Sequence, residues 1–267
     1  MALDPTIAST VDVPEVAGTS TAPLPASSAP GASGPLGAPA SSSSAASAAA
    51  DPSAGPLVFP TGGVPAITYA SMDGATCEAA LKKRAIKFVT VASAWGVDRP
   101  IRLDAPMHGV TFHGLGSTKA LATSIYEIID CRLALALDDF AVILEKHDVI
   151  EAVHMSIYRP AAKTGKPGQH SRHEAALAID LGTLKKKDGS YLSVLEDWHG
   201  HIGDKTCVAG AGAPTPVTKK SLEIRGILCE AYAAKLFNVM LTPTFNKPHD
   251  NHFHLEVTRG VKWMIVH

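Results

Sequence analysis

The chain has 267 residues, of which 46% are hydrophobic and 18% are charged, and its formal net charge is -1 at pH 7. A balance this close to neutral argues against nucleic acid as the main partner, because nucleic-acid-binding proteins usually gather basic side chains on one face. The sequence contains no run of about 18 apolar residues, so it predicts no membrane-spanning helix.

Residues 1–60 differ in composition from the rest of the chain. They contain no Lys or Arg, they consist mainly of Ala, Ser, Pro and Gly, and Phe59 is their one aromatic residue. Such a segment cannot bury enough apolar surface to offset the entropy lost on ordering, which predicts a disordered tail. One folded domain is expected over residues 61–267. The tail also lacks the basic and continuous apolar regions of a signal peptide.

The four cysteines, Cys77, Cys131, Cys207 and Cys229, form an even set without a CxxC pair. The missing CxxC spacing disfavours a thiolate zinc site. Two disulfides in an oxidising compartment are the favoured interpretation, and four buried thiols are the alternative. Pairing of nearest neighbours in sequence would join Cys77 to Cys131 and Cys207 to Cys229. Disulfides predict an extracytoplasmic location (periplasm, cell wall or secreted), with which the lack of a signal peptide is in tension.

The first strongly periodic segment of the chain spans residues 122–146. Apolar residues recur there at helical spacing and predict one long helix: Ile125, Ile128, Ile129, Leu133, Leu137, Phe140, Val142, Ile143 and Leu144. Residues 149–158 have the composition of a strand, which Arg159-Pro160 ends. A polar loop is expected over 161–172 and a second strand over 176–181. The run of lysines at 185–187 is expected in a solvated turn.

The C-terminal part of the chain repeats the change from helix to strand. Residues 222–237 have helical periodicity, residues 238–241 form a short predicted strand, and a turn is expected over 243–250. Residues 252–258 alternate between polar and apolar side chains, as a last strand would. The order helix, strand, strand, helix, strand, strand predicts an α+β domain with a small, mainly antiparallel sheet flanked by helices.

Asp180 is an acidic residue within an otherwise apolar predicted strand. A buried carboxylate must be paired, hydrogen-bonded or metal-bound, because burying it alone costs several kcal/mol. His173 precedes it by seven residues, at the end of the polar loop. The functional interpretation is a metal site, and the alternative is an ion pair with Arg159 or Arg172.

His252-Phe253-His254 supplies the second half of the predicted site. Residues two apart in a strand share a face, so both imidazoles point the same way while Phe253 points into the core. His173, Asp180 and His254 together offer two nitrogens and one oxygen. A fourth tetrahedral position would remain for water, whose pKa zinc lowers towards neutrality, which is typical of a catalytic zinc site.

These residues also carry a family resemblance. Residues 171–180, SRHEAALAID, resemble the SxHxxGxAxD motif of the D-Ala-D-Ala metallopeptidases and related lysostaphin-type enzymes, and residues 252–254 resemble their closing HxH. Residues 126–257 more closely resemble the extensin-like C-terminal domain family, whose elements recur here as Cys131-Arg132, Tyr158-Arg159, Asp197-Trp198 and residues 246–254. The resemblance implies a zinc-peptidase-like fold. Ala176 departs from it by occupying the Gly position of the motif.

The resemblance implies a role for each site residue. His173, Asp180 and His254 would bind one zinc ion, and Ser171 would contact substrate. His252 would be the general base, since Asn251 stands where some relatives have Glu. Arg159 would neutralise the oxyanion or hold a substrate carboxylate.

Several other polar residues are candidates for a role at this site. The His199-Gly200-His201 pair lies in a predicted loop without a spaced acidic partner. Asp250 would either orient His252 or cap the turn, and Glu256 shares the face of the two histidines but is equally explained by an ion pair. Ser156 lacks the His-acid arrangement of a serine hydrolase.

The leading hypothesis is therefore a zinc metallopeptidase that cleaves peptide bonds in bacterial peptidoglycan stem peptides or cross-links, acting as a D-Ala-type carboxypeptidase or endopeptidase. The alternative is a non-catalytic cell-wall binding or scaffolding protein that keeps zinc only for structure. The tail would be a linker, or it would accompany export without a signal peptide. If the protein is exported without a signal peptide, a secretion system or an immunity protein would be its partner. The sequence does not identify either one.

Overall fold

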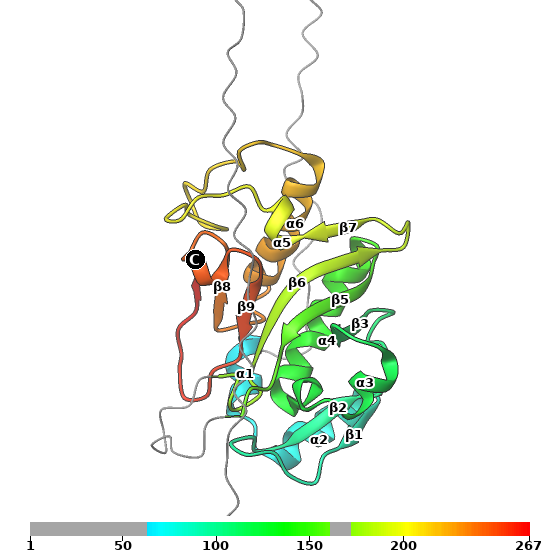
Figure 1. Ribbon diagram of the computed structural model, residues 1–267. Coiled ribbons are helices and arrows are strands. Elements are labelled where there is room, and N and C mark those ends of the chain that lie inside the picture. The colour runs from blue at the N-terminus through cyan, green and yellow to red at the C-terminus, as the bar shows by residue number, and fades with distance from the viewer. Residues whose placement is uncertain (1–62, 161–171) are drawn as a thin grey trace, which may run out of the picture. The chain divides into compact units, whose positions relative to one another are not determined.

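The computed structural model describes residues 63–160 and 172–267 (Figure 1). The predicted disordered tail over 1–60, the loop over 161–171 and the predicted substrate contact Ser171 lie outside the described residues. Among the described helices, none is long and apolar enough to cross a membrane.

A seven-stranded mixed sheet forms the centre of the described part of the chain. Its strands run in the order β10 (Ile265–Val266), β8 (Val239–Leu241), β9 (Phe253–Glu256), β6 (Ala178–Lys186), β5 (Val149–Ser156) and β3 (Thr111–Gly114), and β7 (Tyr191–Ser193) pairs with β6. Strands β8, β9, β6 and β5 pair antiparallel, as do β6 and β7, whereas β3 and β10 join in parallel. The predicted α+β class with a mainly antiparallel sheet is confirmed.

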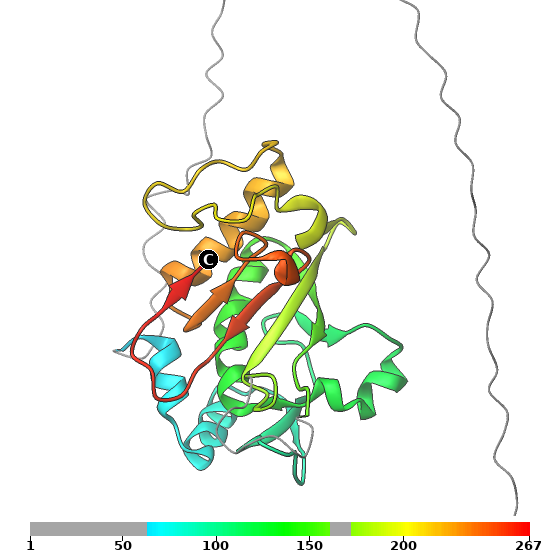
Figure 2. The same cartoon turned by 60° about the vertical axis from the view of Figure 1, so that its left-hand side comes forward.

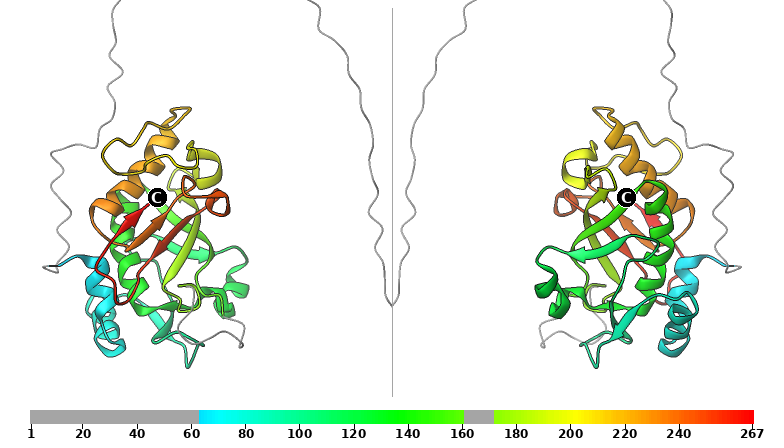
Figure 3. Two further views of the ribbon diagram at one scale, coloured as in Figure 1. Left: turned by 90° about the vertical axis from the view of Figure 1, so that its left-hand side faces the viewer. Right: turned by 90° about the vertical axis from the view of Figure 1, so that its right-hand side faces the viewer.

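Helices α4 (Cys131–Lys146) and α6 (Lys219–Ala233) lie on one face of this sheet (Figures 2 and 3). Helix α4 is buried along most of its length, and Phe140 packs edge-on against Phe237 with ring centroids 5.7 Å apart. Burial of this kind stabilises a helix more than its intrinsic propensity does. Short helix α5 (Val194–Asp197) follows β7.

The region before α4 contains elements that the periodicity did not predict. Helices α1 (Pro65–Ser71) and α2 (Gly74–Lys83) contact α4, and a second, three-stranded sheet is formed by β1 (Phe88–Thr90), β2 (Pro100–Leu103) and β4 (Ile129–Asp130). These strands have two to four residues, which is too short for alternation to be recognised in a sequence.

The single long helix predicted over 122–146 is wrong in its first part. Helix α3 (Thr118–Thr123), the 3-10 turn η1 (Ile125–Glu127) and strand β4 occupy that stretch, and α4 begins at Cys131. Asp130 is the reason, because its side chain accepts from the Arg132 backbone N–H and so caps the helix there. Ile128 and Ile129 are still buried, which explains why the apolar pattern continued through them.

Other boundaries also differ from the expectation, most clearly at β5, α6 and β6. Strand β5 ends at Ser156, two residues early, and α6 runs over 219–233 instead of 222–237. Strand β6 continues to Lys186, so Lys185 and Lys186 are strand residues and the predicted turn contains only the last lysine of the run. Their ammonium groups pair with Glu151 and Glu223 on neighbouring elements, which offsets the cost of placing two lysines in a strand.

Both predicted disulfides are present. Cys77 of α2 is bonded to Cys131 at the start of α4, with 6.0 Å between their Cα atoms. Cys207 is bonded to Cys229 of α6, with 5.0 Å between Cα atoms. The first bond ties the N-terminal helices to the central helix, and the second ties the 199–216 excursion to α6.

Candidate metal centre

The site lies on the face of the sheet opposite α4 and α6, where β6 and β9 pair antiparallel. Asp180 and His254 are direct partners in that pairing, so their side chains leave the sheet on the same side. Their neighbours Ile179, Phe253 and Leu255 are buried in the core, as alternation requires. His173 comes from the turn that leads into β6.

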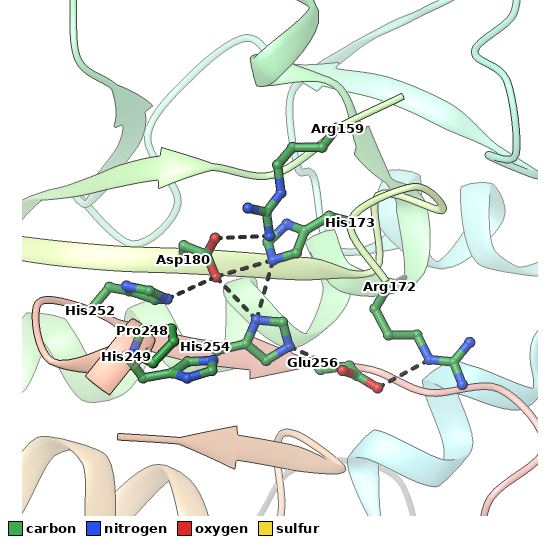
Figure 4. Close-up of a pocket in the computed structure, with 9 residues that line it drawn as sticks. All are labelled: Arg159, Arg172, His173, Asp180, Pro248, His249, His252, His254 and Glu256. Carbon is green, nitrogen blue, oxygen red and sulfur yellow. Dashed lines mark hydrogen bonds and ion pairs between the residues drawn. The ribbon is translucent and has the colours of Figure 1, made fainter. Parts of the chain in front are cut away.

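The three residues predicted as metal ligands meet in this structure (Figure 4). The Nε2 atom of His173 lies 3.1 Å from Oδ1 of Asp180 and 3.2 Å from Nδ1 of His254. The same Oδ1 lies 3.0 Å from Nδ1 of His254. One atom from each side chain therefore forms a nearly equilateral triangle.

Hydrogen bonds outside the triangle determine which ring nitrogen carries the proton. His173 Nδ1 lies 2.8 Å from the carbonyl oxygen of Ile157, which accepts only, so Nδ1 must be the donor. His254 Nε2 lies 3.1 Å from Oε2 of Glu256, which places its proton on that nitrogen. In the neutral rings, the two nitrogens that face Asp180, Nε2 of His173 and Nδ1 of His254, then each present a lone pair to it.

When both rings are neutral, three acceptor atoms converge without a donor among them, and a cation at the centre would satisfy all three. Ligand atoms about 2.0–2.1 Å from a tetrahedral zinc ion lie about 3.3–3.4 Å from one another. The observed separations of 3.0 to 3.2 Å are a few tenths of an ångström shorter. Small side-chain rotations would admit the ion, so the residues fit it.

Without a metal ion, the surroundings of His254 favour a proton on its ring. Burial alone lowers the pKa of His254, but hydrogen bonds to Asp180 and Glu256 outweigh burial and raise that pKa to about 9. Burial raises the pKa of Asp180, and its interactions with the His173 and His254 rings more than compensate, holding that pKa well below its usual range. The carboxylate is therefore ionised and the site attracts positive charge.

The predicted ion pair between Arg159 and Asp180 also exists, and it coexists with the metal geometry. Nη2 of Arg159 lies 3.3 Å from Oδ2 of Asp180, and the Ser156 hydroxyl donates to the same oxygen at 3.1 Å. Only Oδ1 faces the histidines. Because the two oxygens have separate partners, the carboxylate is oriented and half of it stays available to a metal ion. The Arg159 side chain is 54% exposed.

His252 lies beside the triangle and not within it. Its Nε2 is 3.5 Å from Oδ1 of Asp180, while its Nδ1 lies 2.8 Å from Oδ1 of Asn251. The side-chain oxygen of Asn251 accepts the Nδ1 proton, which leaves the Nε2 lone pair facing the site. Burial is the main effect on His252 and lowers its pKa, so this imidazole is neutral at pH 7 and can accept a proton.

Sequence reasoning missed the partner that orients His252. Asp250 was weighed for that position, but its carboxylate pairs with Lys247, and Asn251 makes the contact instead. Glu256 both contacts a site histidine and forms an ion pair. Its Oε2 accepts from His254, and its Oε1 pairs with Arg172 at 3.1 Å. The Ile157 carbonyl has no signature in the sequence, because any residue could supply it.

Two adjoining clefts open on the site. The first, the metal cleft, has a volume of about 520 Å³ and is lined by the residues drawn in Figure 4. The second, of about 470 Å³, shares Arg159, Asp180, Pro248 and His252 with the first and adds Tyr126 and Met155. We call it the Tyr126 cleft. The metal ligands therefore lie in an accessible depression and not in a closed interior.

The His199-Gly200-His201 pair lies away from the site. His199 contacts the carbonyl of Pro216 and His201 lies near Asp204, so neither joins the site. His154 is buried and pairs with Glu127 at 3.2 Å. Ala176, at the Gly position of the motif, has a φ of 52°, in the left-handed region that favours glycine.

No family model matches this chain, and comparisons with curated proteins and with solved structures found no match. The resemblance to the extensin-like C-terminal domain family therefore stays a prediction that rests on the motif residues.

Proposed function

We propose that the protein is a zinc-dependent hydrolase that cleaves peptide bonds in bacterial peptidoglycan. The observation that carries the proposal is the meeting of three acceptor atoms, one each from His173, Asp180 and His254, with both imidazole tautomers set by outer hydrogen bonds. Both outer acceptors, the Ile157 carbonyl and Glu256, hold the inner ring nitrogens in the orientation that a shared metal ion would require.

Zinc is the metal that this donor set favours. Two imidazole nitrogens and one carboxylate oxygen suit zinc, whereas magnesium and calcium take mainly oxygen ligands. All four cysteines are in disulfides, so no thiolate competes for the ion. Three protein ligands beside an accessible cleft are typical of catalytic zinc sites, while structural sites usually have four.

The side chains around the triangle support hydrolysis. A bound zinc ion would supply a Lewis acid and a water molecule of lowered pKa. Neutral His252, oriented by Asn251, would take the proton of the attacking water on Nε2. Arg159 would neutralise the negative charge that develops on the scissile carbonyl oxygen, since its guanidinium lies at the cleft and is half exposed.

The substrate class rests on the motif resemblance, which implies peptides of the cell wall. Two disulfides agree with an oxidising, extracytoplasmic compartment, where peptidoglycan is found. The location in periplasm, cell wall or medium is proposed on the same grounds.

Purified peptidoglycan incubated with the zinc-loaded protein, followed by mass spectrometry of the released muropeptides, tests the proposal. Wild-type protein should release cut peptides. His252→Ala should retain zinc and release none, and His201→Ala, which alters an exposed histidine away from the site, should behave as wild type. Zinc binding without cleavage of any wall peptide would instead favour a non-catalytic zinc protein of the cell wall.

A further inference from the structure

The Tyr126 cleft differs in chemistry from the metal cleft that it adjoins. Among the described residues that line it, Tyr126, Met155, Ser156, Pro248 and Asn251 carry no charge. Its charged groups, Arg159 and Asp180, face each other across 3.3 Å at the side shared with the metal cleft. The metal cleft contains Arg172 and Glu256 in addition. The two sides of the metal triangle therefore present different surfaces to a ligand.

Two exposed apolar side chains form the outer part of the Tyr126 cleft. Tyr126 is 52% exposed and Met155 is 46% exposed, although both are large enough to favour burial. Neighbouring Ile125 is 45% exposed as well. An exposed apolar group beside a polar site is typical of a surface that a ligand covers.

The backbone beneath leaves this space open. Gly182 follows Asp180 by two residues on β6 and so lies on the same face of the sheet. A Cβ atom at position 182 would lie 3.3 Å from Cε of Met155 and 3.6 Å from the carbonyl oxygen of Asn251. A side chain there would crowd the thioether, and glycine avoids this.

The residues on both sides of Tyr126 make side-chain contacts with neighbouring elements. On one side, the Arg102 guanidinium donates to the carbonyl of Ser124. On the other, Glu127 accepts from the backbone N–H of Gly114 at 2.9 Å and pairs with buried His154 at 3.2 Å. The His154–Glu127 pair has no part in the proposed chemistry. The pair instead holds the 3-10 turn η1, which contains Tyr126, at the cleft. A wall that is already in place binds a ligand at a lower entropic cost.

We infer that Tyr126 and Met155 form a substrate subsite, next to the metal triangle, that takes an uncharged residue on one side of the scissile peptide bond. The inference rests on the proposed function and narrows it, because it assigns the charge of one substrate residue. An alanine or another small apolar side chain would contact the ring and the thioether. A glutamate or lysine side chain would lose hydration there, while the two charged groups of the cleft, Arg159 and Asp180, already pair with each other.

Phosphinate peptide analogues, which cannot be hydrolysed at the replaced bond, test the subsite by binding alone. Three analogues would carry alanine, glutamate or lysine on one side of the phosphinate, and three more would carry them on the other side. Isothermal titration of the zinc-loaded protein measures each Kd. On one side, and not on the other, the alanine analogue should bind about tenfold or more tightly than the charged ones.

Variants of exposed residues then locate the preference. Tyr126→Ala should reduce the preference for the alanine analogue over the charged ones to less than about threefold. Met155→Lys should reverse the preference, so that the glutamate analogue binds more tightly than the alanine analogue. Tyr191→Ala is the matched control, since Tyr191 is 48% exposed on β7 and lines neither cleft. Equal binding of all analogues, or a preference that Tyr126→Ala leaves intact, overturns the subsite even if wall peptides are cut. Discrimination without any hydrolysis of wall peptides would support the subsite while the proposed catalysis fails.

Discussion

Replacing Glu256 by alanine should weaken zinc binding although Glu256 does not itself belong to the metal triangle. Its Oε2 accepts the Nε2 proton of His254 at 3.1 Å, and its Oε1 is fixed by Arg172 and by the Thr258 hydroxyl. Without the acceptor, the ring of His254 loses the bond that turns its Nδ1 lone pair toward Asp180. Loss of such an outer partner typically lowers metal affinity 10- to 100-fold, or about 1.4–2.7 kcal/mol.

Competition with a chromophoric chelator measures the zinc Kd of each variant. Glu256→Gln should retain most of the affinity, because the amide oxygen still accepts a proton from His254. Glu230→Ala is the matched control, since Glu230 also accepts from a histidine, His147, at 2.8 Å but lines neither cleft. Thermal unfolding of the metal-free variants separates affinity from folding. A Kd for Glu256→Ala within twofold of wild type would refute the argument that this carboxylate orients the ligand.

Three further predictions concern pH, the core and the cleft. In the metal-free protein, burial lowers the pKa of His254 but hydrogen bonds raise it to about 9. A raised pKa stabilises the fold fully below about pH 6.5, and this contribution, about 3 kcal/mol, is lost as pH rises through about 9. Urea unfolding in the presence of a metal chelator should show this loss of unfolding free energy in the wild type and not in His254→Ala. Phe140→Ala should cost about 3–5 kcal/mol of unfolding free energy, because Phe140 is fully buried against Phe237; a cost below 1 kcal/mol in chemical denaturation contradicts the packing described. Arg159→Ala should leave the zinc Kd within about threefold of wild type, because the Ser156 hydroxyl still donates to Oδ2 of Asp180. It should lower kcat/KM on wall peptides by about 10²–10³-fold; an equal loss in both would show that Arg159 acts by holding Asp180.

The meeting of His173, Asp180 and His254 could be predicted from the sequence because the signals of these residues are local. Asp180 stands out as an acid within an apolar strand, and residues 252 and 254 share a face through strand geometry alone. The seven-residue spacing then brings His173 to the start of the same strand. The disulfides followed from their even number and nearest-neighbour pairing.

The contacts that orient those ligands depend on tertiary structure and could not be predicted. The Ile157 carbonyl reaches His173 only because the end of β5 lies beside the turn before β6. Asn251 was identified merely as the replacement for a glutamate, yet its amide oxygen sets the tautomer of His252. The long predicted helix failed for a related reason: apolar spacing does not distinguish helix from buried extended chain, and the Asp130 cap decided the boundary.

X-ray absorption at the zinc K-edge, together with metal analysis of the purified protein, tests the central claim most directly. The account predicts one zinc ion per chain with nitrogen and oxygen neighbours at about 2.0–2.1 Å, including two imidazoles, and no sulfur neighbour at about 2.3 Å. His173→Ala should lose the bound ion, while His201→Ala should keep it. A protein that takes up no stoichiometric zinc, or one that holds the ion equally well without His173, would contradict the account.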